Sequence, residues 1–256
     1  MTVKHGSTPG KRPASLIDIP VRNGILAALL ATEYRRLLPR LEHVTLRRGQ
    51  VIYRADQKIE EVYFPEDAVV AMVDTTADNR TTEVGIVGRE GMVGINIFLG
   101  GVVTPDRAIV QIPGGAMRMT SKYLRKEVRF GSPLRQLLIT YTRTLLAVIS
   151  KSVACSQHHS IEQRLARWLL TMNNYAGSGE FLMAHDSIAA MLGVQRVGIT
   201  GAARKLQAAG LIRYRRGRMR VLDAAGLEKK SCECYRFIRR QHEDLRGALP
   251  RLLSRK

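Results

Sequence analysis

The stretch 185-HDSIAAMLGVQRVGITGAAR-204 has the spacing of two short helices that cross at a tight turn. Ile188 and Leu192 lie one helical turn apart, and Gly193 supplies the left-handed conformation that such a turn requires. The buried stripe then continues in the second helix, through Val194, Ile199, Ala202 and Leu206. This pattern predicts a helix-turn-helix, with a packed amphipathic helical hairpin as the alternative.

The opposite face of the second helix is rich in hydrogen-bond donors and consists of Gln195, Arg196, Thr200, Gly201 and Arg204. Arg and Gln side chains form bidentate pairs with base edges in the major groove, so this face suits DNA. Residues 211–222 then alternate about an Arg-Gly turn, as in a β-hairpin. Its basic residues form a wing after the helix pair, which favours a DNA-binding helix-turn-helix over the packed helical hairpin; they are Arg213, Arg215, Arg216, Arg218 and Arg220.

The formal net charge of +19 is concentrated in the second half of the chain. Residues 1–120 hold 15 Lys and Arg against 13 Asp and Glu, a net of +2, whereas residues 121–256 hold 26 against 9, a net of +17. Such a split is expected of a polyanion-binding module joined to a near-neutral domain. The longest apolar run, residues 25–31, is too short to cross a membrane.

Short β-forming runs separated by turn clusters occupy the first half of the chain. They predict strands at 51–53, 62–64, 69–73, 83–87, 108–112 and 116–119, with a further turn at residues 113–115. Strands at such intervals indicate a small β-barrel or jelly roll. Ahead of them, Asn23 is placed to cap a helix that runs towards Leu38 and stops at Pro39.

A long helix is predicted to begin at Ser132, with Pro133 as its first helical residue. Its apolar face is larger than one small barrel would cover, so we expect it to form a dimer interface. The expected interface residues are Leu134, Leu138, Tyr141, Leu145, Val148 and Ile149. The alternative is that this helix merely lies on the barrel.

The predicted fold class is α+β, and the chain divides into five segments. They are a flexible leader (1–22), a β-barrel or jelly-roll domain (23–131), a dimerisation helix (132–157), a winged helix-turn-helix domain (158–223) and a C-terminal helical tail (224–256). Ser160 and Gln163 form a capping box at the start of the fourth segment, and Asp223 is placed to cap one last helix through Tyr235 and Leu245.

This order of barrel, long helix, capped helix, helix-turn-helix and wing resembles the Crp/Fnr family of bacterial transcription regulators. The resemblance covers roughly residues 40–223 and is most specific from 164-RLARW-168 to the wing. It implies a cyclic-nucleotide-binding-like sensor domain and a homodimer on a near-palindromic DNA site, with its recognition helices about 34 Å apart. RNA polymerase is the expected protein partner.

The family's DNA-binding pattern carries over in part. The family commonly has adjacent Arg and Glu at the start of the recognition helix and a second Arg four residues after the Glu; this chain keeps Arg196 but has Val197 and Gly201 there. Ala184 replaces the usual capping hydroxyl, so His185 or Asp186 is expected to serve the helix start or a phosphate. The expected DNA-binding residues are Gln195, Arg196, Thr200, Arg204, His185, Arg215, Arg216 and Arg218.

The positions that match the family's effector pocket are Gly94, Ile95 and Arg107. Relatives that bind a cyclic nucleotide use Gly-Glu for the ribose hydroxyl and Arg-Ser or Arg-Thr before Ala for the phosphate. Here Ile95 cannot accept a hydrogen bond, Asp106 would repel the phosphate, and Arg107 is one position out of place. We therefore expect no control by cyclic AMP, and the effector stays open.

Three cysteines are too few for a disulfide framework, which favours a cytoplasmic protein. Residues 1–120 hold no cysteine for an iron–sulfur sensor. Cys155, His158 and His159 have no evident fourth zinc ligand, and Cys232 and Cys234 would face different ways on a helix. The sequence therefore predicts neither a metal site nor a cofactor, while a redox-sensing thiol stays open.

Together these features predict a sequence-specific transcription regulator with no catalytic residues and no enzymatic activity. Two alternatives belong to other classes. One is an architectural DNA binder whose barrel only dimerises. The other is a cupin-type metal enzyme, which needs clustered His and carboxylate ligands, whereas only His5 and His43 lie in the first half of the chain.

Overall fold

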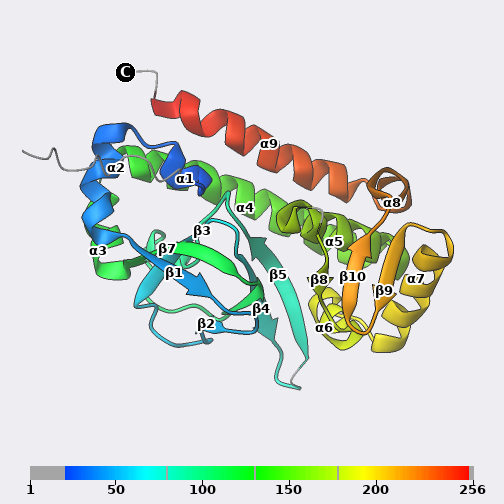
Figure 1. Ribbon diagram of the computed structural model, residues 1–256. Helices are drawn as coiled ribbons and strands as arrows, with labels where there is room; N and C mark the ends of the chain where they lie inside the picture. Colours follow the sequence, from blue (N-terminus) through cyan, green and yellow to red (C-terminus); the bar gives the residue numbers. More distant parts are fainter. Residues whose placement is uncertain (1–20, 79, 130, 178, 254–256) are drawn as a thin grey trace, which may run out of the picture.

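The computed structural model describes residues 21–78, 80–129, 131–177 and 179–253, so nearly all of the predicted leader, residues 1–22, lies outside the described residues. Two β-sheets lie beneath a long helix, α4 (Pro133–His158), and a group of helices and short strands lies at the far end of that helix (Figure 1). A last helix, α9 (Cys234–Leu253), returns along α4. The chain has the expected α+β fold.

The N-terminal sheets are antiparallel and share one core, but they do not close into a barrel. One sheet has the order β1-β7-β3 and the other the order β2-β6-β4-β5. The strands are β1 (Glu42–Leu46), β2 (Val51–Tyr53), β3 (Glu61–Pro65), β4 (Val69–Thr75), β5 (Thr81–Val87), β6 (Arg107–Ile112) and β7 (Gly114–Thr120). All six predicted strands are present. The turn expected at residues 113–115 is wrong in part, because Gly114 and Gly115 already pair with β1.

Strand β4 is buried on both faces. Val70 and Met72 belong to the core between the two sheets, whereas Val69, Ala71 and Val73 belong to a second core with the C-terminal helices. Since successive side chains of a strand point to opposite faces, one strand forms the wall between the two cores. The C-terminal domain is therefore packed directly on the sheet.

The N-terminal helix differs from the sequence prediction. Asn23 caps it as expected, accepting hydrogen bonds from the backbone N–H groups of Ile25 and Leu26. The chain then breaks into α1 (Gly24–Ala27), α2 (Ala31–Leu37) and a 3-10 turn at Leu38–Arg40 that contains Pro39. The extended conformation of Leu30 restarts the helix in a new direction. Helix α3 (Ser121–Glu127) follows the sheets.

Helix α4 begins as predicted, with Ser132 accepting a hydrogen bond from the Arg135 N–H and Pro133 at the first position. The predicted dimer seam, however, packs mostly inside the protomer. Leu134, Leu138, Tyr141 and Leu145 are at most 8% exposed and lie in the core of the sheets, while Val148 and Ile149 are half-buried. The alternative, that this face lies on the sheet domain, is correct for those four buried residues.

A different face of α4 is exposed. Ile139, Leu146 and Val153 are 41%, 59% and 60% exposed and stand seven residues apart, which is the period of a coiled-coil position. We call these three residues the exposed ridge. Helix α4 also has the length and apolar content of a membrane span. Its opposite face is buried against the sheets, as in the core helix of a folded domain.

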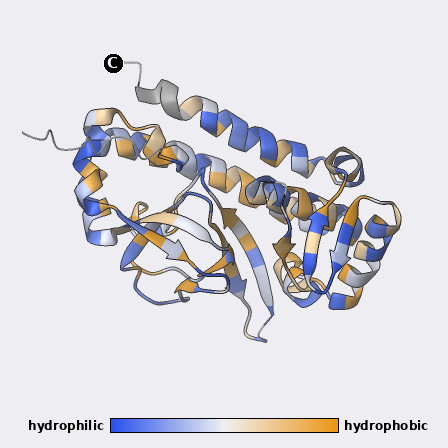
Figure 2. Cartoon of the chain, in the orientation of Figure 1, coloured by the Kyte–Doolittle hydropathy of each residue, from blue (hydrophilic) through white to orange (hydrophobic). Residues whose placement is uncertain are grey.

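The C-terminal part contains α5 (Ile161–Ala176), β8 (Phe181–Leu182), α6 (His185–Leu192), α7 (Arg196–Ala208), β9 (Ile212–Arg215), β10 (Arg218–Val221), α8 (Ala224–Lys230) and α9. The single last helix expected after Asp223 is two helices. Asp223 caps α8, and the chain breaks at residues 231–233 before α9 begins. Helix α9 buries Tyr235, Ile238 and Leu245 and is otherwise largely hydrophilic (Figure 2).

Candidate nucleic-acid interface

Helices α6 and α7 form the predicted helix pair. Gly193 ends α6 in the left-handed conformation, with φ of 62°. Ile188, Leu192, Ile199 and Leu206 are buried in the core beneath the pair, as their spacing predicts. Val194 is only half-buried. The pair is therefore anchored by one apolar face and leaves the other to solvent.

The exposed face of α7 carries three of the predicted DNA-contacting residues, whereas Thr200 is half-buried and donates its hydroxyl to the Arg196 carbonyl. Gln195, at the N-cap, and Arg204 are exposed, and the Arg196 side chain is 68% exposed. Val197, which was not among the predicted contacts, is 72% exposed. An exposed valine at the start of a recognition helix is suited to apolar contact with a thymine methyl group. We call Gln195, Arg196, Val197 and Arg204 the reading face.

His185 and Asp186 are engaged with α7. No side chain caps α6, and the Asp186 carboxylate lies 3.4 Å from Nε of Arg196. His185 Nδ1 lies 3.1 Å from the Thr200 hydroxyl, and its ring stacks on Tyr214 at 4.1 Å between centroids. Burial first, and then the charge of Arg196, lowers the pKa of His185. The structure thus places His185 as a link between α6, α7 and the wing.

The two glycines inside α7 have different surroundings. A Cβ at Gly198 would lie 2.7 Å from Cδ1 of Ile161, so close helix packing accounts for this glycine. A Cβ at Gly201 would meet nothing within 4 Å. Gly201 lowers helix propensity by roughly 1 kcal/mol relative to Ala. Packing within the protomer does not explain why it is there.

The wing is the predicted hairpin, with β8 added as a third strand. Arg216 and Gly217 have φ of 49° and 76°, the two positive values of a type I′ turn. Arg215 and Arg216 are exposed, whereas Arg218 is paired with Glu180 at 3.6 Å. The wing tip therefore presents two free guanidinium groups within the described residues.

The helix-turn-helix also contacts the sheet domain. A Cβ at Gly193 would lie 3.0 Å from the Thr82 hydroxyl, and Trp168 Nε1 of α5 donates a hydrogen bond to Glu83 at 3.4 Å. Burial raises the pKa of Glu83 from 4.5 to about 7, although the Trp168 hydrogen bond and Arg167 oppose this rise. A titratable carboxyl thus lies at the junction between the two domains.

This junction predicts a pH dependence of stability. Between the unfolded pKa of 4.5 and the folded pKa of about 7, the folded protein keeps a proton that the unfolded chain has lost. The free energy of unfolding should therefore fall as the pH rises through this window, by about 1–2 kcal/mol after allowance for partial exposure. Urea unfolding at pH 5 and pH 8 measures this difference.

The matched variants for this measurement are Glu83→Gln and Glu60→Gln. Glutamine at 83 still offers an oxygen to Trp168 but does not titrate, so the variant should lose this part of the pH dependence. Glu60 has a side chain that is 68% exposed, and its variant should behave like the unmodified protein. If Glu83→Gln kept the full pH dependence, the Glu83 carboxyl would not be its source.

The positions matched to the family's effector pocket do not form an open polar site. Gly94 has φ of 88° and precedes a 3-10 turn (Ile95–Ile97), and Ile95 is 6% exposed in the core. Asp106 accepts hydrogen bonds from Tyr53 and Thr104. Nε of Arg107 is buried and has no hydrogen-bond partner among the described residues.

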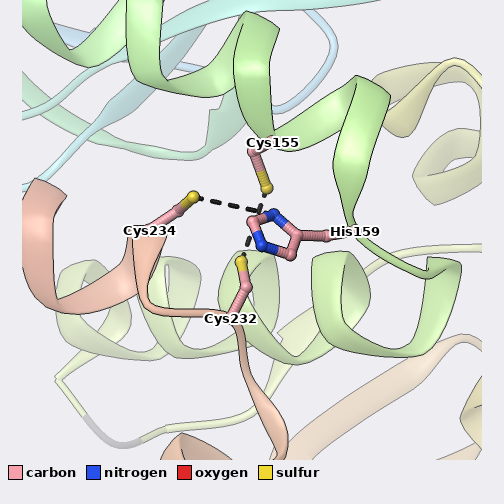
Figure 3. Close-up of side chains that lie close together, drawn as sticks. All are labelled: Cys155, His159, Cys232 and Cys234. Carbon is pink, nitrogen blue, oxygen red and sulfur yellow. Dashed lines mark hydrogen bonds between the residues drawn. The ribbon is translucent and has the colours of Figure 1, made fainter.

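A second group of polar side chains lies at the end of α4 (Figure 3). The expectation that Cys232 and Cys234 lie on one helix and diverge is wrong, because Cys232 lies in the connection between α8 and α9. Both thiols lie beside Cys155 and His159, whereas His158 is exposed. The pKa of Cys155 is lowered to about 5, mainly by a hydrogen bond from Cys232. Burial opposes this shift, and the charge of Arg167 adds to it.

Comparison with known proteins identifies the C-terminal part. Residues 163–230 match the Crp-like helix-turn-helix domain family. Comparison with curated protein sequences gave no match.

Solved structures are similar over most of the chain. FixK2 from Bradyrhizobium japonicum has a TM-score of 0.64 at 17% identity, covering 75% of this chain and 98% of its own. TTHB099, a CRP-family transcriptional regulator from Thermus thermophilus, has a TM-score of 0.63 at 18% identity, covering 73% and 96%. The c-di-GMP-responsive regulator CLP of Xanthomonas campestris has a TM-score of 0.56 at 13% identity, covering 75% and 99%.

These findings confirm the resemblance found in the sequence: the chain carries a Crp-like helix-turn-helix domain and has the fold of the Crp/Fnr transcription regulators.

Proposed function

We propose that this protein is a cytoplasmic transcription regulator that reads a near-palindromic DNA site as a homodimer and has no enzymatic activity. The observation that carries the proposal is the reading face, which is exposed on a helix pair whose other side is buried. An Arg and a Gln at the start of such a helix match the hydrogen-bonding edges of the major groove. At the wing tip, the exposed Arg215 and Arg216 are placed to bind phosphates of the DNA backbone.

The exposed ridge supports the homodimer. Apolar side chains at seven-residue spacing pair with the same face of a second helix, and the ridge is free on a helix whose other faces contact the sheets and α9. A twofold axis along α4 would present two reading faces to successive turns of the duplex, about 34 Å apart. RNA polymerase is the proposed protein partner of the DNA-bound dimer.

The sensor domain is proposed to act without cyclic AMP. The buried Ile95 offers no acceptor to a ribose hydroxyl, and Asp106 places negative charge beside the matched phosphate position. Titrating cyclic AMP into a DNA-binding assay tests this. Unchanged affinity is expected, and a strong rise would overturn this part of the proposal.

Selection of binding sites from random duplexes by the purified full-length protein, at stated salt, tests the proposed function. A recovered motif with twofold symmetry is expected. Recovery without sequence preference would favour an architectural DNA binder, and bound metal with turnover would favour a cupin-type enzyme. Either result would overturn sequence-specific regulation.

Replacing Arg216 should weaken binding to every duplex alike. Its position at the wing tip suits a phosphate contact, and the loss of one such contact reduces the slope of log affinity against log salt by about one unit. Arg216→Asn is the suitable variant, because asparagine tolerates the positive φ of this residue. Arg216→Lys keeps the charge and should keep the slope. An unchanged slope in Arg216→Asn would exclude the phosphate contact.

A further inference from the structure

Three thiols and one imidazole converge where α4 meets the connection between α8 and α9 (Figure 3). Cys155 lies in the last turn of α4 and His159 directly after it, whereas Cys232 and Cys234 flank the start of α9. Their four donor atoms all lie within 4.8 Å of one another. The three cysteines are at most 3% exposed. We call these four residues the cysteine–histidine cluster.

The separations fit ligands of a single ion. The sulfurs of Cys155 and Cys232 are 3.4 Å apart, and the Cys234 sulfur is 3.8 Å from Nδ1 of His159. In a tetrahedral site with zinc–sulfur bonds of about 2.3 Å and zinc–nitrogen bonds of about 2.0 Å, the sulfur–sulfur and sulfur–nitrogen separations come to about 3.8 Å and about 3.5 Å. A disulfide would bring two sulfurs to about 2.0 Å. An iron–sulfur cluster would attach its ligands to different irons and spread them further apart.

The imidazole is oriented for this role by a carboxylate. Nδ1 of His159 faces the thiols, and Nε2 lies 3.2 Å from Glu233, which stands between the two cysteines in the sequence. Metal-binding histidines usually donate their second ring N–H to a carboxylate or carbonyl, which fixes the tautomer that ligates. Glu233 therefore orients the His159 ring and is not itself one of the four donors.

We propose that Cys155, His159, Cys232 and Cys234 bind one Zn²⁺ as a closed structural site. Three sulfurs and one nitrogen complete the tetrahedral coordination that structural zinc prefers and leave no position for substrate. Each thiol gives up its proton when it binds. The ion would join the end of α4 to the start of α9, and so hold the DNA-binding domain against the long helix.

The test is the metal content of the full-length protein, purified under reducing conditions. We expect about one zinc per chain by elemental analysis. After exchange with Co²⁺, we expect the absorption of a tetrahedral thiolate site. Less than a tenth of an equivalent, with no cobalt spectrum on reconstitution, would overturn the proposal. So would a Cys155–Cys232 disulfide in protein protected from air, because that pair would then be a redox couple.

Variants identify the ligands. Cys232→Ser should lose the zinc, whereas His158→Ala, which removes an exposed histidine beside the cluster, should keep it. His159→Cys should keep one ion but change the cobalt spectrum, which keeps the test decisive if Cys232→Ser does not fold. Glu233→Gln should keep the stoichiometry and weaken zinc binding by about 10- to 100-fold. Loss of zinc in His158→Ala with retention in His159→Cys would exclude this ligand set.

Discussion

Replacing Leu146 by aspartate should make the protein monomeric and lower its affinity for a palindromic site by about 100-fold or more. Leu146 is the central residue of the exposed ridge and is 59% exposed. A carboxylate there would have to be desolvated against its own copy on the twofold axis. Without the dimer the two half-sites are bound independently, and the gain from linking them, typically 10²- to 10⁴-fold, is lost.

The control for this variant is Leu222→Asp. Leu222 is 45% exposed and follows β10 in the C-terminal part, where its backbone N–H donates to the Leu211 carbonyl, so the same substitution lies away from the exposed ridge and should leave the dimer intact. Sedimentation velocity gives the oligomeric state, and titration of whole and half sites separates dimer loss from unfolding. A Leu146→Asp protein that stays dimeric would show that the interface lies elsewhere.

Replacing Arg196 by alanine should weaken binding to the preferred site by about 1–3 kcal/mol per half-site and relax discrimination at one base pair. The reason is that an exposed guanidinium at the start of α7 can donate two hydrogen bonds to a guanine edge. Its ion pair with Asp186 holds it near that position when DNA is absent. Competition binding against sites varied at single base pairs measures both effects.

Arg240→Ala is the matched control for this variant. Arg240 is 80% exposed on α9 and is paired with Asp244 at 3.8 Å, much as Arg196 is paired with Asp186, but it lies outside the reading face. Its loss should leave the base preference unchanged. Equal losses on preferred and random DNA in Arg196→Ala would mean that Arg196 contacts the backbone.

The helix pair, the wing hairpin and six strands of the N-terminal sheets could be predicted because their signals are local, whereas β1 and β8 were not predicted. Gly193 and the Arg216-Gly217 turn occupy positive φ, and the buried residues of α6 and α7 follow the helical period. The separation of the strands into two sheets, in place of a closed barrel, could not be predicted, because it depends on contacts between strands far apart in the sequence. The break between α8 and α9 has no glycine or proline to mark it.

Helix α4 shows why periodicity alone did not identify which of its faces is buried. Helix α4 has two apolar stripes, one through Leu138 and Tyr141 and one through Leu146 and Val153. Both stripes follow helical spacing, so the sequence does not tell which one meets the sheet. Only the packing of the folded chain decides which stripe is buried. The buried stripe is the one that we expected at the dimer interface.

The cysteine–histidine cluster was missed because its two halves are distant in the chain. Cys155 and His159 have the four-residue spacing that puts two side chains on one helical face, which was the available signal. Cys232 was assigned to a helix that in fact ends at Lys230.

Strand β4 has a consequence for how the molecule unfolds. Because its alternate side chains complete two different cores, the N-terminal and C-terminal halves cannot melt independently without exposing Val69, Ala71 and Val73 to water. A fragment cut before α5 would lose part of its own hydrophobic interior. Heat or denaturant should therefore act on this two-domain chain as on one cooperative unit.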